Sequence, residues 1–370
     1  MSKLKLVASS IMFIICSLII SACGDNQADT AAKRIGISMP TQSLQRWNQD
    51  GQNIKRMLEE RGYKVDLQYG GENEIPVQVS QIENMIANNV GILIIAAVDG
   101  ESLTEVLEQA KANNVTVIAY DRLIMNTDAV TYYATFDNWR VGVMQGEFLV
   151  NALDITNISD TVNMEFFTGD PADNNINFFF DGALSVLKPY LDDGRISVPS
   201  GQTDKLVAAI EGWNTERAQD RMENIISANN YSPRDTPLHA VLSSNDSIAQ
   251  GITTALVNAG YNAENIPYIT GQDCDIISVK NILAGLQAMS VFKDTRTLAN
   301  VVVEMVDAIM QGGEPPLNDR ETYDNGTGII PAYLCDPVIA TKDNIYGKLR
   351  KPPHIPPDFR WRAKLCHIIA

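Results

Sequence analysis

The stretch VTVIAYD, residues Val115–Asp121, is almost continuously apolar until it ends in an acid. Two later stretches have the same form, LHAVLSSND (Leu238–Asp246) and PYITGQD (Pro267–Asp273). Runs that are apolar on both faces are typical of parallel strands buried between two layers of helices. The carboxyl ends of such strands are where open α/β sheets bind their ligands. We therefore expect an α/β fold of parallel sheets with a polar site at the strand ends.

Apolar runs of this kind alternate along the chain with segments of helical period, which indicates repeated βαβ units. The expected strands are Arg34–Met39, Val65–Tyr69, Gly91–Ala97, Val115–Tyr120, Asn163–Phe167, Leu238–Ser243 and Ile266–Thr270. The expected helices are Asp50–Glu60, Ile75–Asn88, Leu103–Ala112, Val141–Leu153, Asn177–Leu191, Arg217–Ala228 and Ser247–Ala259. Val65–Tyr69 alternates apolar and polar residues, so we expect it nearer a sheet edge.

Local signals mark some helix boundaries. Gly62 and Gly260 follow predicted helices and are typical of helix ends. Asp246 and Ser247 are suited to begin the helix that follows them.

The pattern at the N-terminus predicts an export signal. Lys3 and Lys5 precede an apolar run, Leu6–Ile20, and small residues lead to Cys23. A Cys at this point is typical of bacterial lipoproteins, in which the thiol is acylated and anchors the chain. We expect residues 1–22 to be the signal, residues 23–33 a tether, and the protein to be extracytoplasmic and membrane-anchored. The alternatives are a cleaved signal with an incidental Cys, and a membrane span, for which the run is short.

Composition excludes several functions. The chain carries 45 acidic against 29 basic residues, a balance that disfavours nucleic acid as a partner. Cys274, Cys335 and Cys366 show no paired spacing, so we expect no disulfide framework and no metal site. His239 begins a predicted strand and is expected to be structural. We expect no catalytic residue and no cofactor.

Polar side chains gather where the predicted strands end. Those with the chemistry of a small polar ligand site are Arg46, Trp47, Asp121, Arg122, Asp173, Asn175, Trp213, Asn245, Asp273 and Lys293. Carboxylates and amides bond neighbouring hydroxyls, Arg offers a bidentate fork, and Trp offers a flat apolar face. Taken alone, each could instead be a turn, a helix cap, a core aromatic or a solvated charge. Their joint placement favours a closed monosaccharide site.

Longer motifs join these residues and follow one order along residues 34–345: Gln45-Arg46-Trp47, Ala119-Tyr120-Asp121-Arg122-Leu123, Ala134-Thr135-Phe136-Asp137-Asn138, Asp173-Asn174-Asn175, Ser244-Asn245-Asp246, Thr270-Gly271-Gln272-Asp273, Val291-Phe292-Lys293-Asp294-Thr295 and Tyr323-Asp324-Asn325-Gly326. In this order they resemble the periplasmic-type sugar-binding proteins of ABC importers, in the xylose-binding and multiple-monosaccharide-binding group.

The resemblance implies two Rossmann-like, doubly wound domains joined by a hinge of three crossovers. It implies that the ten residues named above form the ligand shell. Asp137 would lie beside the first crossover, Lys293 beside the second, and Asn325 near the third. One lobe would combine residues 34–136 with 294–324, the other 137–293 with 325–345. The basic, Pro-rich tail, 346–370, departs from the family pattern and receives no function.

We therefore expect a lipid-anchored, monomeric receptor that delivers an aldose such as xylose, arabinose, galactose or glucose to the permease of an ABC importer. One alternative is a sugar sensor of the same fold that signals to a chemoreceptor or a sensor kinase. Another is an extracytoplasmic glycoside-active enzyme in which Asp121 and Asp273 act as a carboxyl pair. A DNA-binding regulator is disfavoured because the chain lacks a helix-turn-helix pattern and begins with an export signal.

Overall fold

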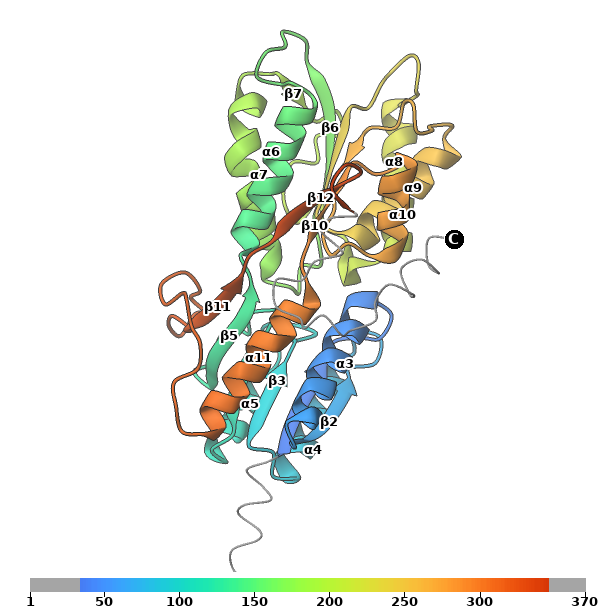
Figure 1. Ribbon diagram of the computed structural model, residues 1–370. Helices are drawn as coiled ribbons and strands as arrows, with labels where there is room; N and C mark the ends of the chain where they lie inside the picture. The colour runs from blue at the N-terminus through green and yellow to red at the C-terminus, as the bar shows by residue number, and fades with distance from the viewer. Residues whose placement is uncertain (1–33, 346–370) are drawn as a thin grey trace, which may run out of the picture.

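The computed structural model describes residues 34–345, which form two α/β lobes joined end to end (Figure 1). The first lobe contains a parallel sheet with the strand order β11-β5-β4-β3-β1-β2. Its elements are β1 (Arg34–Met39), α3 (Gln45–Glu60), β2 (Lys64–Tyr69), α4 (Ile75–Ala87), β3 (Ile92–Ile95), α5 (Thr104–Ala112), β4 (Thr116–Tyr120), β5 (Val130–Phe136), α11 (Thr295–Met310) and β11 (Ala332–Cys335).

The second lobe contains a parallel sheet with the order β7-β6-β8-β9 and an antiparallel pair, β10-β12. A bridge between Gln272 and Val291 aligns this pair with the end of β9. The elements are α6 (Asn138–Ala152), β6 (Val162–Phe167), α7 (Asn175–Asp192), β7 (Ile196–Ser197), the 3-10 helix η2 (Glu211–Trp213), α8 (Thr215–Asn229), β8 (Ala240–Ser243), α9 (Asp246–Asn258), β9 (Tyr268–Ile269), α10 (Ile276–Ala284), β10 (Met289–Phe292) and β12 (Val338–Thr341).

The continuous apolarity of the strands has a direct structural reason, which β3 illustrates. Ile92 and Ile94 pack with residues of α3 and α11, whereas Leu93 and Ile95 pack with residues of α4 and α5. Successive side chains of a strand point to opposite faces, so a sheet with helices on both faces needs apolar residues at every position. The predicted doubly wound α/β class is confirmed, and β2 lies at the sheet edge as expected.

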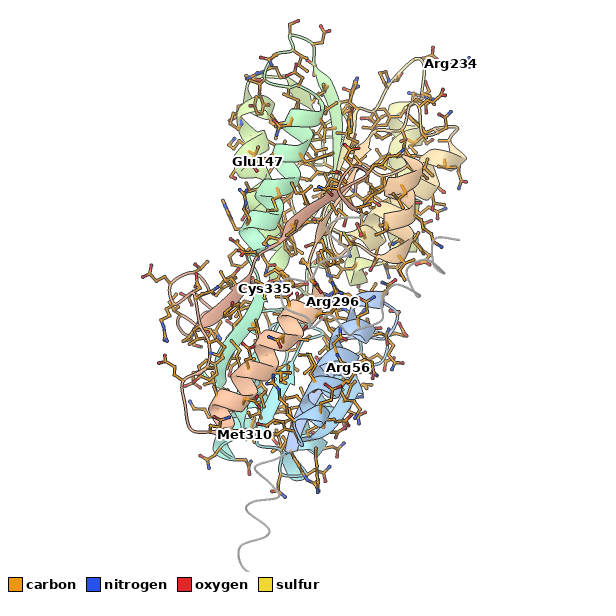
Figure 2. All side chains as sticks on the ribbon, viewed as in Figure 1. Arg56, Glu147, Arg234, Arg296, Met310 and Cys335 are labelled. Atoms are coloured by element: carbon orange, nitrogen blue, oxygen red, sulfur yellow. The ribbon has the colours of Figure 1, made fainter. Side chains whose placement is uncertain are left out.

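The chain passes between the lobes three times. It leaves β5 at Phe136 and enters α6, leaves β10 at Phe292 and enters α11, and leaves β11 at Cys335 and enters β12. Figure 2 shows Cys335 where the two lobes meet. At the first passage Asp137 lies between the lobes, and its carboxylate accepts a hydrogen bond from the backbone N–H of Arg140.

The assignment of Asn325 to the third crossover is wrong. Asn325 is fully buried in the first lobe, where its amide donates to the carbonyls of Ile124 (3.1 Å) and Thr127 (2.7 Å). Because β11 then pairs with β5, the chain stays in the first lobe until Cys335. The third connection therefore comprises Asp336 and Pro337, and residues 325–335 do not belong to the second lobe.

Two local expectations change in detail. The first helix begins at Gln45 rather than Asp50, so Arg46 and Trp47 lie on a helix and not in the loop before it. The cap of α9 is the side chain of Asn245, which accepts from the N–H of Ile248, and not Asp246 or Ser247. The helix ends expected at Gly62 and Gly260 are confirmed, and both glycines have positive φ angles (88° and 93°).

Several expectations concern residues outside the described range. They are the signal at 1–22, the tether at 23–33 with Cys23, and the tail at 346–370. Among the helices of residues 34–345, none combines the length and the hydropathy needed to cross a bilayer.

Candidate binding site between the lobes

A cavity of about 30 Å³ lies between the two lobes, and all ten candidate residues line it. From the first lobe come Arg46, Trp47, Asp121 and Arg122, and from the second lobe come Asp173, Asn175, Trp213, Asn245, Asp273 and Lys293. Five further residues complete the lining: Leu44, Phe179, Ser247, Gln272 and Asp275. A cavity of this size holds one or two water molecules, because charged side chains fill most of the space where the lobes meet.

Strand ends and helix starts position these side chains. Asp121 follows β4, and Lys293 follows β10. Asn175 is the first residue of α7, and Asn245 is the residue before α9. The two lobes present the carboxyl ends of their strands to each other, which is the ligand-binding edge of open α/β sheets.

Ion pairs cross the cavity from one lobe to the other. The guanidinium of Arg46 lies 2.9 Å from Asp121 in its own lobe and 3.3 Å from Asp273 in the other. The ammonium of Lys293 lies 3.0 Å from Asp273 and 4.0 Å from Asp121. Two cations and two carboxylates thus form one buried network that joins the lobes.

Asp50 holds Arg46 in this network by an ion pair within the same helix. It is fully buried one helical turn after Arg46, and its Oδ2 accepts from Arg46 Nη2 (3.1 Å) and Nε (3.2 Å). The hydroxyl of Tyr120 donates to its other carboxylate oxygen. Burial raises the pKa of Asp50 to about 6, against the opposing effect of Arg46. Asp50 therefore fixes the direction of the Arg46 side chain.

A second group of contacts holds the opposite side of the cavity. Arg122 Nε lies 3.0 Å from Asp173 in the other lobe, and Arg122 Nη1 donates to the carbonyls of Ala97 and Val98. The amide of Asn175 donates to the carbonyl of Asp121 across the cleft (2.8 Å). The two backbone carbonyls and the carboxylate of Asp173 together fix the orientation of the Arg122 guanidinium.

Two tryptophan rings form apolar walls. Trp47 is 2% exposed and Trp213 is 4% exposed. The Trp213 ring contacts Phe179 edge-on, with ring centres 6.3 Å apart. It also lies so close to Gly169 that a Cβ there would be 2.0 Å from the ring, so this glycine makes room for the indole.

Three residues that line the cavity carry a buried polar atom with no hydrogen-bond partner within residues 34–345. These atoms are the indole Nε1 of Trp47, the indole Nε1 of Trp213 and the amide oxygen Oε1 of Gln272. Buried polar groups are normally satisfied, so unpaired donors and acceptors around one cavity indicate a site made for a hydroxylated or otherwise polar ligand.

Four non-glycine residues at or beside the cavity have an unusual backbone conformation. Asp121, Trp213, Asp273 and Cys274 all have positive φ angles, of 60°, 54°, 96° and 54°. Non-glycine residues rarely adopt this conformation, and they cluster at functional sites where the fold forces it.

The pKa values of the carboxylates in the site are shifted in opposite directions. Burial alone would raise the pKa of Asp121, but Arg46, Lys293 and Arg122 outweigh it and hold that pKa below its usual value. Burial raises the pKa of Asp173 in spite of Arg122. Burial and the neighbouring Asp273 raise the pKa of Asp275 to about 7. Asp121 is therefore an anion near neutral pH, whereas Asp275 is about half protonated.

This arrangement suits the binding of a neutral, hydroxyl-rich molecule. It offers carboxylates as acceptors, Arg and Lys as donors, and aromatic faces for the apolar side of a ring. Within residues 34–345, no three His, Cys, Asp or Glu side chains cluster as a metal site would require.

Sequence reasoning missed Asp50, Phe179 and Asp275. Asp50 is interior to a helix, and nothing in its sequence neighbourhood distinguishes it from a surface acid. Asp275 follows the candidate Asp273 by two residues. The second acid so close to the same strand end could have marked Asp275 as a candidate too.

Comparison with known proteins gives a consistent result. Residues 35–314 match the family described as "periplasmic binding protein domain". The multiple sugar-binding periplasmic protein SbpA of Azospirillum brasilense is 47% identical over 90% of this chain and 92% of its own length. The multiple sugar-binding periplasmic receptor ChvE of Rhizobium radiobacter is 47% identical over 84% of this chain and 87% of its own.

Among solved structures, an ABC transporter solute-binding protein from Clostridium phytofermentans, determined with bound β-D-glucose, superposes with a TM-score of 0.84. It is 53% identical and covers 88% of this chain and 99% of its own.

Proposed function

The chain belongs to the periplasmic binding protein family, and on that premise we propose that it is a monomeric receptor that binds one aldose between its lobes and delivers it to an ABC importer. Membership of this family implies a binding protein rather than an enzyme, working outside the cytoplasm.

One observation carries the proposal. Arg46 and Asp121 of one lobe and Asp273 and Lys293 of the other converge within hydrogen-bonding distance in a buried cavity. In the proposed complex, Asp121, Asp273, Arg122, Asn245 and Lys293 bond hydroxyls and the ring oxygen. Trp47 or Trp213 stacks on the ring.

The proposed mechanism is closure of the lobes around the sugar. A sugar-sized ligand does not fit in about 30 Å³, so it enters when the lobes part. Once inside, it bonds residues of both lobes only when they come together. These differential contacts favour the closed form, which is the form the importer receives.

The likeness to a glucose-bound ABC transporter solute-binding protein supports the importer as the partner and a hexose as a ligand. Two relatives named for multiple sugars support a site that accepts several aldoses. Pull-down of the membrane partner by the sugar-loaded protein tests the import role. Recovery of a sensor kinase or chemoreceptor in place of a permease would contradict it.

Calorimetric titration against xylose, arabinose, galactose and glucose tests binding directly. We expect tight binding of at least one aldose and no detectable binding by Trp213→Ala or Asp273→Ala. Retained affinity in both variants, with the same folded stability, would mean that the ligand lies elsewhere.

We also propose a lipid anchor at Cys23, supported by the apolar run Leu6–Ile20 and the Ile-Ser-Ala that precedes the cysteine. Metabolic labelling with an alkyne-tagged palmitate in a bacterial host tests it. The label should appear on the protein and be lost in Cys23→Ser; an equally labelled variant would refute the anchor.

A further inference from the structure

Gln272 is a buried side chain of the cavity that has no role among the ion pairs described above. It lies on the segment Thr270–Asp275, which connects β9 to α10, and is 1% exposed. Its amide oxygen has no hydrogen-bond partner within residues 34–345. By contrast, Asp273 of the same segment is held by Arg46 and Lys293.

The backbone of this segment is fixed on every side. The carbonyl of Gln272 accepts from the N–H of Asp246 (3.1 Å), and the N–H of Asp273 donates to the carbonyl of Val291 (2.9 Å). The side-chain amide of Gln145 donates to the carbonyl of Gly271 (3.1 Å). A Cβ on Gly271 would lie 2.1 Å from a carboxylate oxygen of Asp246, so the segment packs without spare room.

A fixed backbone and near-complete burial leave the Gln272 amide little freedom to find a partner within the protein. An unpaired buried carbonyl oxygen is unfavourable, because it has lost water and gained nothing in exchange. A ligand group that donates a hydrogen bond to it removes that cost. A hydroxyl group can donate in this way, whereas a ring C–H cannot.

We propose that the amide oxygen of Gln272 accepts a hydrogen bond from one hydroxyl group of the ligand. Gln272 would then help to determine which aldoses bind. This inference rests on the proposed function. It assigns to Gln272 a different task from the charged residues: Arg46, Asp273 and Lys293 hold any sugar ring, while the neutral amide discriminates between sugars. A site that hydrogen-bonds a given hydroxyl rejects the analogue that lacks it, since a buried polar group is then left unpaired.

The test combines a mutation with removal of single hydroxyls from the ligand. The ligand set is the aldose that binds most tightly in the calorimetric panel, together with its complete series of monodeoxy analogues. Gln272→Met keeps the length of the side chain and removes its acceptor. Gln272→Asn keeps the amide but shortens its reach, and serves where the methionine variant fails to fold.

We expect the variants to bind the parent sugar roughly tenfold more weakly. One deoxy analogue should bind the wild type and Gln272→Met equally well, because the contact is already absent. Gln81→Met is the matched control: Gln81 also carries a buried amide oxygen without a partner, but it does not line the cavity. It should behave as the wild type with every sugar.

Two failures can be told apart. If each deoxy analogue loses the same factor in the wild type and in Gln272→Met, Gln272 does not contact a hydroxyl, although sugar binding stands. If no aldose binds the wild type, the proposed function itself fails.

Discussion

Arg46 and Asp273 belong to different lobes, 227 positions apart in sequence, and their side chains lie 3.3 Å from each other in the cavity. The same guanidinium also contacts Asp50 and Asp121, so one cation is shared by three carboxylates. Removing one member of such a network leaves buried charges without a partner. The site is therefore most sensitive at the residue that joins all the others.

Replacement of Arg46 by Met tests this dependence. It leaves the buried Asp50 without its cation, and it leaves Asp121 and Asp273 to share Lys293 alone. We expect loss of detectable sugar binding and a decrease of about 3–5 kcal/mol in the free energy of unfolding, measured by urea denaturation. Arg56→Met, on the exposed face of the same helix, should change neither by a measurable amount. Normal stability in Arg46→Met would show that the network is weaker than its geometry indicates.

Asp50 acts on the ligand only through Arg46, and Asp50→Asn isolates this role. The amide keeps the shape but loses the charge that orients the guanidinium. We expect affinity to fall roughly tenfold while the relative preference among aldoses stays the same, because no ligand contact is altered. Asp99→Asn, at a strand end outside the cavity, is the control. A changed order of preference would indicate that Asp50 touches the ligand.

The pH dependence of binding should reveal Asp275. Its carboxyl faces Asp273 and Cys274 of its own segment, Asp246 of α9, and the cations Arg46 and Lys293. Its pKa is about 7 with the lobes together, against an ordinary 3.8, because of burial and Asp273. If opening the cleft hydrates Asp275 and returns its pKa to the ordinary value, closure takes up a proton, and affinity falls as pH rises from about 4 to 7. Above that range, both forms are deprotonated and the curve levels off.

Calorimetry across this pH range gives the measurement, and Asp275→Asn provides the comparison. The variant should lose the slope while it still binds sugar at low pH. An identical slope in both proteins would assign the titration to another group. Asp246 is a poor candidate for that group: it lies inside the second lobe, so its raised pKa affects folding more than closure.

Much of this architecture could be predicted from the sequence, and the limits have physical reasons. The buried strand β3 is apolar at every position, and β4 is apolar after Thr116, a strong signal that arises from helices on both faces of the sheet. The start of α3 was missed because its first turn carries Arg46 and Trp47, which serve the site, and its cap position is Leu44 without a side-chain cap.

The residues of the candidate site could also be predicted in part from the sequence. Residues at strand ends, such as Asp121 and Asp273, were recognisable because parallel strands end at one edge of a sheet. Asp50 and Phe179 were not, since a helix interior shows which face is polar but not what that face meets. Asn325 was misplaced because its motif resembles a family segment, whereas the crossover depends on β11, a short strand whose pairing with β5 is not visible locally.

Close packing of α6 against α7 gives a last prediction, which concerns stability first. A Cβ on Gly142 would lie 2.0 Å from the carbonyl oxygen of Phe179, and 2.8 Å from the backbone nitrogen of Ala183. Neither backbone atom can move aside as a flexible side chain could, so the helices must separate. We expect Gly142→Ala to lower the free energy of unfolding by about 1–3 kcal/mol.

The matched control is Gly313→Ala, where the added methyl would meet its nearest neighbour, the carbonyl oxygen of Ala308, at an ordinary 3.4 Å. It should unfold at the wild-type urea concentration. Because Phe179 also lines the cavity, separation of the helices would shift this ring against Trp213, and sugar affinity should fall together with stability. Equal stability of Gly142→Ala and wild type would contradict the close contact of the two helices.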